Sequence, residues 1–115
     1  MFDFENLKVY HKAEHFNKCL RAQIPRIPLD IEVNRQLKRS ALSIMLNIAE
    51  GSGRLTNLDK RRFYIVARGS VFETVSILRI VFDEKSIDQR QYDEFYNAAD
   101  EISKMLYVMI RNLKK

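Results

Sequence analysis

The residue types best suited to metal chemistry gather near the N-terminus. Residues 11–15 read His-Lys-Ala-Glu-His, and Cys19 follows four positions later. This is the H-x-x-E-H pattern of the inverted zinc peptidase motif, and ligands four apart share one face of a helix. Ligands at i, i+4 and i+8 nevertheless rotate by about 40° per step, and a catalytic zinc needs a ligand from a second element. We therefore predict no metal at His11, Glu14, His15 and Cys19, and no cofactor.

A second candidate for chemistry is the glycine-rich run Gly51-Ser52-Gly53-Arg54. It follows a helical pattern and lacks the Lys-Ser/Thr pair of a phosphate-binding loop. A helix C-cap and a tight turn explain it. Both histidines lie in one short stretch, and no nucleophile or carboxylate pair is matched to a base. We predict no catalytic residue and no enzymatic activity.

Positive charge is concentrated in the middle third of the chain. The net charge is +5, and the segment 35–68 holds eight basic residues against two acids, Glu50 and Asp59, so all of the excess lies there. Localised positive charge is typical of proteins that contact phosphate backbones; the alternative is a solvated helix face. The candidate nucleic-acid contacts are Arg35, Lys38, Arg39, Arg54, Lys60, Arg61, Arg62 and Arg68.

Helices must position these side chains. The 115 residues fit one domain, predicted to span 1–115, and three glycines and two prolines are too few for a β-rich fold with many turns. No apolar run reaches the roughly 18 residues of a bilayer span, and the acidic N-terminus is unlike a signal peptide. The single Cys19 cannot form an internal disulfide. We expect a cytoplasmic domain that is not inserted in a membrane.

Apolar residues recur at helical spacing in four segments. Prolines, glycines and residues that favour helix N-caps separate the segments. Short connections between four helices predict an all-α fold, an antiparallel up-down four-helix bundle. The predicted boundaries, in chain order, are 6–23 with a stop at Pro25, Asp30 to Gly51 or Gly53, Thr56 or Asn57 to Phe82, and Asp88 to Leu113.

Small and polar residues interrupt the apolar stretches of the second and third helices. A turn centred near position 55 places Ala41 opposite Ser70. It also places Glu50 opposite Arg61. A glycine inside a helix costs about 1 kcal/mol relative to alanine, so we predict that Gly69 marks a close helix crossing and that Gly69→Leu is strongly destabilising. The residues expected to fix this register, or alternatively to shape a basic channel, are Asn47, Glu50, Gly51, Gly69, Ser70 and Glu73.

The same two helices carry more apolar positions than one buried face needs. A helix that is apolar on nearly all sides must be covered on more than one side. We therefore expect contacts between copies of the chain, with scattered surface residues as the alternative. The surplus positions are Leu42, Met45, Leu46, Phe63, Ile65, Val66, Phe72 and Ile80.

Several ordered segments resemble one known family. They are residues 4–13, 36–41, 43–51 and 67–73, with Arg54 and Phe63 between them. Together they are similar to the small four-helix-bundle proteins encoded in intervening sequences of bacterial large-subunit ribosomal RNA genes. The chain departs from the family at Met45-Leu46, where Pro-Ala is usual, and at Tyr10, where tryptophan is common.

The resemblance implies a four-helix bundle that assembles as a homopentamer and has no established catalytic activity. A related branch comprises accessory proteins of diversity-generating retroelements, which are basic, pentameric and bind nucleic acid and a reverse transcriptase. We therefore expect a non-enzymatic oligomer that neutralises the phosphates of RNA without reading bases. The only aromatics among the cations, Phe63 and Tyr64, are expected in the core. The alternative is a protein-interaction scaffold that binds no nucleic acid.

Overall fold

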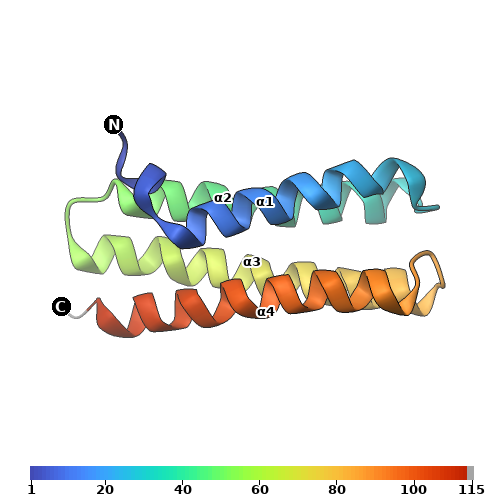
Figure 1. Ribbon diagram of the computed structural model, residues 1–115. Helices are drawn as coiled ribbons and strands as arrows, with labels where there is room; N and C mark the ends of the chain where they lie inside the picture. The colour runs from blue at the N-terminus through green and yellow to red at the C-terminus, as the bar shows by residue number, and fades with distance from the viewer. Residues whose placement is uncertain (114–115) are drawn as a thin grey trace.

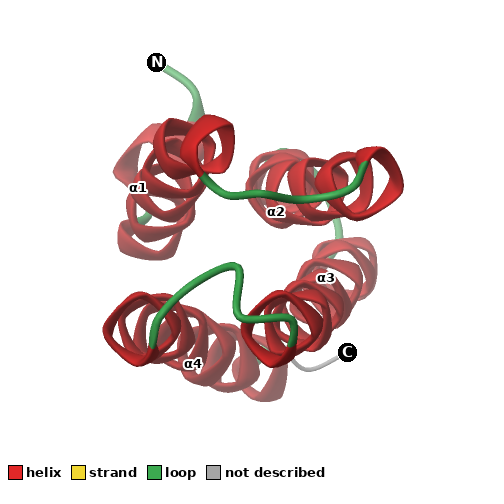
Figure 2. Cartoon of the chain, turned by 90° about the vertical axis from the view of Figure 1, so that its right-hand side faces the viewer, coloured by secondary structure: helices red, strands yellow, loops and turns green. Residues whose placement is uncertain are grey.

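The structure is a computed structural model that describes residues 1–113. Its helices lie side by side along one long axis, and both the N-terminus and the end of the last helix lie at the same end of the bundle (Figure 1). Seen end-on, the helices form a square in chain order, so each packs against two neighbours (Figure 2). The predicted all-α four-helix bundle is confirmed. The helices are α1 (Lys8–Gln23), α2 (Ile31–Ser52), α3 (Asn57–Asp83) and α4 (Gln89–Asn112).

Side-chain caps fix the start of three helices. Asp30, Thr56 and Asp88 each accept a hydrogen bond from the backbone N–H three residues later, at 2.8 to 3.1 Å. Gln91 completes a capping box by accepting from the backbone N–H of Asp88. These side chains satisfy amide groups that have no partner inside the helix. Thr56, and not Asn57, is therefore the N-cap of α3.

The start of α1 differs from the prediction by two residues. Asp3–Asn6 forms a short 3-10 helix, and Leu7 is extended, with φ −90° and ψ 119°. The α-helix therefore begins at Lys8. Phe4 packs on Tyr10 with 4.6 Å between ring centroids, which folds the N-terminal turn back against α1.

The core is formed by the apolar stripes that the helical spacing predicted. Phe16 of α1 and Phe95 of α4 meet edge to face, with 6.1 Å between ring centroids. A fully buried side chain of this size contributes about 1.5–3 kcal/mol, so these stripes are the main source of stability. The largest fully buried side chains are Leu20, Ile24, Leu37, Ile44, Ile48, Leu78, Ile102 and Leu106.

The close approach of α2 and α3 lies at Gly51, not at Gly69. A Cβ atom on Gly51 would lie 2.8 Å from Tyr64 Cε1 and 2.9 Å from Phe63 Cβ. Gly51 is buried in the last turn of α2, and Gly53 is the C-cap. A Cβ atom on Gly69 would meet no atom within 4 Å, and Gly69 is exposed. The prediction of a crossing at Gly69 is wrong, because that position of α3 faces outward.

Burial of the Tyr64 ring against Gly51 also changes the acidity of its hydroxyl. Tyr64 is 4% exposed. This burial, and secondarily the negative charge of Asp3, raises the pKa of Tyr64, because both disfavour the phenolate. The neutral phenol is therefore the form that the folded bundle accommodates.

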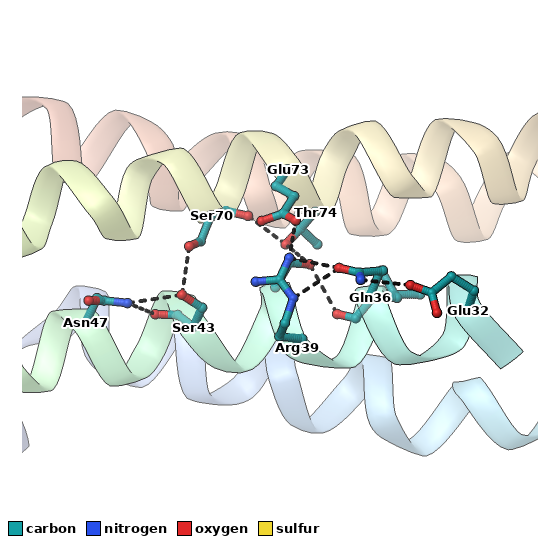
Figure 3. A network of polar contacts seen from close by, with 10 residues as sticks. Glu32, Gln36, Arg39, Ser43, Asn47, Ser70, Glu73 and Thr74 are labelled. Atoms are coloured by element: carbon teal, nitrogen blue, oxygen red, sulfur yellow. Dashed lines mark hydrogen bonds and ion pairs between the residues drawn. The ribbon is translucent and has the colours of Figure 1, made fainter.

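A chain of hydroxyl contacts sets the register between α2 and α3 (Figure 3). Ser43 Oγ lies 2.8 Å from Ser70 Oγ, and Asn47 Nδ2 donates to the Ser43 carbonyl at 2.8 Å. One turn further along, Thr74 Oγ1 lies 2.8 Å from Ser40 Oγ. Ser70 therefore faces Ser43 and not Ala41, so the predicted register is displaced. Ser70 takes part in a contact between the two helices, whereas the hydrogen bonds of Asn47 to Ser43 lie within α2; a role of Asn47 in fixing the register stays a prediction.

Ion pairs at the edge of this interface follow the same displaced register. Glu73 pairs with Arg39, and Glu50 pairs with Arg54 four residues later in the chain at 3.1 Å. Glu50 does not pair with Arg61 as predicted. With Ser43 opposite Ser70 and Ser40 opposite Thr74, α3 is shifted along α2 relative to the register that a turn centred near position 55 predicts. The predicted partners are therefore not opposite each other.

The Ser40–Thr74 contact gives a test of this register. Both residues are 0% exposed. Thr74→Val removes the contacts of the Thr74 hydroxyl with Ser40 Oγ and with the Ser70 carbonyl oxygen, and a typical hydrogen bond contributes about 0.5–1.5 kcal/mol. We expect Thr74→Val to lower the free energy of unfolding by about 1 kcal/mol. The double variant Ser40→Ala/Thr74→Val should lose less than the two single changes together, with a coupling of at least about 0.5 kcal/mol. Urea unfolding of the four proteins measures this coupling, and additive losses would contradict it.

Candidate nucleic-acid interface

The eight candidate cations do not form one surface. Arg35, Lys38 and Arg39 lie on the N-terminal half of α2, where Arg35 pairs with Glu32 at 2.8 Å. From Arg35 to Arg54 the chain rises by about 28 Å along the helix axis. That separation is well beyond the screening length of about 8–10 Å at physiological salt. The two groups therefore act as separate charges toward a ligand.

A compact group of cations lies where α2 ends and α3 begins. We call Arg54, Lys60, Arg61 and Arg62 the basic corner. The Arg54 guanidinium lies 4.4 Å from the centroid of the Phe63 ring, a cation–π distance. Arg54 and Arg62 line the same groove, of about 320 Å³, and Asp59 lies between them. Arg62 is 4.0 Å from Asp59, and its side chain is 72% exposed.

Two members of the basic corner also hold the bundle together. Lys60 Nζ donates to the Ser52 carbonyl oxygen at 2.7 Å, at the C-terminal end of α2. Arg61 Nε donates to the Ile110 carbonyl oxygen of α4 at 3.2 Å. Carbonyl groups in the last turn of a helix lack an intrahelical partner, and a cation there also suits the helix dipole. No sequence pattern predicts this bond of Arg61, because its partner lies 49 positions away.

Arg68 lies apart from the basic corner, between α3 and α4. Its Nε donates to the Ser103 carbonyl oxygen at 3.4 Å. Its guanidinium carbon is 4.8 Å from the Phe72 ring centroid and 5.5 Å from that of Tyr107. Arg111 lies 6.0 Å from the same Tyr107 ring. Sequence reasoning missed Tyr107 and Arg111, although their spacing of four residues, off the apolar stripe of α4, is a signal for a shared surface.

The histidines of α1 do not converge on one point. His15 Nε2 is 3.4 Å from Cys19 Sγ. His11 Nε2 is instead 2.6 Å from the Glu5 carbonyl oxygen, and His11 Nδ1 is 3.9 Å from Glu14. Within residues 1–113, no three side chains of His, Cys, Asp or Glu gather closely enough to hold a metal ion.

The end of the bundle opposite the basic corner is rich in acids. They flank the α1–α2 and α3–α4 connections, on the right in Figure 1. Arg35 and Arg90 pair with two of them, Glu32 and Glu94. Exposed cations at the same end nearly balance these acids, so this end is close to neutral; they are Arg21, Arg26, Arg35, Arg79, Lys85 and Arg90. The exposed acids are Asp30, Glu32, Asp83, Glu84, Asp88, Asp93 and Glu94.

The sequence matches the model of the 23S rRNA-intervening sequence protein family over residues 5–108. The chain belongs to this family. The match runs from the N-terminal 3-10 helix into the last turns of α4, so it includes the basic corner and Arg68. The family resemblance drawn from the sequence is confirmed, and the relation to retroelement accessory proteins stays a prediction.

A solved structure of similar fold comes from Bacteroides thetaiotaomicron. It is a protein of unknown function from the S23 ribosomal protein family, 23% identical to this chain, with a TM-score of 0.86. The alignment covers 90% of this chain and 99% of that one, so the bundle is common to both. No curated protein is similar enough in sequence to match. Neither the family's description nor the neighbour's states a catalytic activity.

None of the helices within residues 1–113 combines the length and the apolar character that crossing a bilayer demands.

Proposed function

We propose that this 23S rRNA-intervening sequence family member is a non-enzymatic, self-associating module that binds the phosphate backbone of RNA. The observation that carries the proposal is the basic corner, where four cations outnumber the two carboxylates that pair with them, Glu50 and Asp59. Arginine and lysine neutralise phosphates and release their counterions, and this term dominates binding that does not depend on base sequence.

The charge distribution along the bundle supports this proposal. The basic corner attracts a polyanion, whereas acids and cations nearly balance at the opposite end, so a strand is drawn toward the end where α2 meets α3. The long axis measures 44 Å, several times the screening length at physiological salt. The two ends therefore act independently, and the modest net charge of +5 understates the attraction at the corner.

The exposed apolar surface of α3 supports self-association. Leu58 and Val66 are 45% and 52% exposed, and Leu46 of α2 is 52% exposed. Apolar side chains gathered on one surface mark interaction sites. The family resemblance implies five copies. A closed assembly would repeat the basic corner on every copy, and several weak contacts on one strand gain avidity.

A salt titration tests the nucleic-acid part. We expect fluorescently labelled single-stranded RNA to bind the purified protein, and its log affinity to fall linearly with log salt by about 0.7 per neutralised phosphate. Light scattering should give several times the 13.6 kDa mass of one chain. Absence of RNA binding at low salt would contradict the proposal and favour a protein-interaction scaffold, for which the apolar face of α3 is suited. A clean monomer would contradict self-association.

A further inference from the structure

The groove between α3 and α4 combines exposed aromatic rings with positive charge. Its volume is about 440 Å³, within the range of about 300–1,000 Å³ that is usual for small-molecule sites. Phe72 and Tyr107 are 58% and 53% exposed, although large aromatic side chains are usually mostly buried. The lining residues are Ile65, Arg68, Gly69, Phe72, Tyr107 and Ile110.

Gly69 keeps this groove open. A side chain there would meet no other atom within 4 Å, so the packing of the chain itself does not require glycine. Glycine in the interior of an exposed helix is nevertheless unfavourable relative to alanine. A molecule from outside the chain that approaches the α3 backbone would account for the glycine.

Arg68 brings charge to the centre of the groove. It lies between the two exposed rings, at 4.8 and 5.5 Å. Only its Nε is used in a hydrogen bond, and neither terminal nitrogen has a partner among residues 1–113. Arg61 and Arg111 flank the groove on α3 and α4, whereas no carboxylate lines it.

The geometry points to a site for an unpaired base of single-stranded nucleic acid. The base stacks on the exposed faces of Phe72 and Tyr107, and the terminal nitrogens of Arg68 bind the adjoining phosphate. This inference rests on the proposed function and extends it, since the basic corner recognises phosphates alone. A polyanion with planar bases complements both the rings and the arginines. A second copy that packed through the same groove in a two-fold contact would oppose arginine to arginine.

Two RNA probes of equal charge separate stacking from phosphate contacts. One is a short oligoriboadenylate, and the other is an abasic ribose-phosphate oligomer of the same length. We expect the wild type to bind the oligoriboadenylate at least about 5-fold more tightly, the effect of stacking one base. The chain has no tryptophan and five tyrosines, so quenching of tyrosine fluorescence by the oligoriboadenylate gives a second readout.

Matched variants identify the site. Phe72→Leu and Tyr107→Leu remove a ring but keep the charge, so the ratio of the two affinities should fall toward one while the salt slope stays unchanged. Tyr107→Leu should also lose part of the quenching. Tyr96→Leu is the control, because Tyr96 is 43% exposed on α4 but does not line the groove; its ratio should equal that of the wild type.

Three outcomes would overturn the site, and they differ in what they say of the proposed function. Equal binding of the two probes by the wild type would leave phosphate binding intact and remove the base site. Binding of neither probe would reject both proposals. A Gly69→Leu variant that changes the mass by light scattering but keeps the affinity ratio would show that a second copy occupies the groove.

Discussion

Replacing Gly51 with leucine is expected to cost about 3 kcal/mol or more of unfolding free energy. A Cβ atom alone would lie 2.8 Å from Tyr64 Cε1 and 2.9 Å from Phe63 Cβ. Phe63 Cβ is tied to the α3 backbone, and the Tyr64 ring is buried, so neither can yield by a simple rotation. The end of α2 must therefore move away from α3. Urea unfolding followed by circular dichroism measures the loss.

Gly69 provides the matched control for this substitution. A Cβ atom at position 69 would meet no atom within 4 Å, and this position lines a groove with room for a larger side chain, so we expect stability close to that of the wild type. The two alanine variants should change the free energy of unfolding in opposite directions. Gly69→Ala gains up to about 1 kcal/mol of helix propensity, whereas Gly51→Ala loses stability, since the contact at 2.8 Å outweighs that gain. Equal effects at the two glycines would show that α2 and α3 do not cross at Gly51.

Helix starts could be predicted from the sequence where they are decided locally. Asp30, Thr56 and Asp88 carry short acceptor side chains that reach the free amides of the following turn, and this preference depends on only four residues. The first helix was placed two residues too early. The local pattern from Asn6 onward is compatible with a helix, but the N-terminal turn folds back to pack Phe4 on Tyr10.

The register between α2 and α3 could not be predicted from periodicity. A helical wheel gives the buried face of each helix, but not how far one helix slides along the other. Here that distance is set by contacts between hydroxyl groups, such as Ser43 with Ser70. Several serines and a threonine offer alternative pairings of similar chemistry. The crossing was wrongly predicted at Gly69 for the same reason, because only the observed register places Tyr64 against Gly51.

The candidate site was predicted from the number of cations, whereas the contacts that each cation makes decide which of them can bind a ligand. Counting cations found the segment 35–68. The count did not show that Arg35 pairs with Glu32 at the end of the bundle opposite the basic corner. Nor did it show that Arg61 donates a hydrogen bond to α4. Phe72 was expected to be covered by another copy, and Tyr107 was not singled out. Their proximity depends on how α3 and α4 face each other across Arg68, which a single sequence does not encode in any short pattern.

Among the cations that open α3, Lys60→Glu is expected to reduce stability. Lys60 Nζ donates to the Ser52 carbonyl oxygen at the C-terminal end of α2, and a hydrogen bond from a charged group contributes about 1.5–3 kcal/mol. A carboxylate there would also face the negative end of the α2 dipole. The interaction of the glutamate with the N-terminal end of the α3 dipole is favourable, but it contributes only about 0.3–1 kcal/mol. We expect a net loss of about 2 kcal/mol in urea unfolding.

Arg62→Glu is expected to reduce RNA affinity and to leave the fold unchanged. The Arg62 side chain is 72% exposed, and its pairing with Asp59 at 4.0 Å is a surface contact, so the change in stability should stay within about 0.5 kcal/mol. The variant should bind labelled single-stranded RNA more weakly at low salt. The slope of log affinity against log salt should become shallower by about 0.7 for each phosphate contact that is lost.

Arg90→Glu separates the basic corner from net charge. Arg90 is 87% exposed, pairs with Glu94 and lies at the end of the bundle opposite the basic corner. Arg90→Glu changes the total charge by the same amount as Arg62→Glu. Because the two ends are further apart than the screening length, Arg90→Glu should keep the salt slope of the wild type. Equal weakening by both variants would mean that RNA responds to the charge of the whole molecule. A loss confined to Arg62→Glu would assign the phosphate contacts to the turn between α2 and α3.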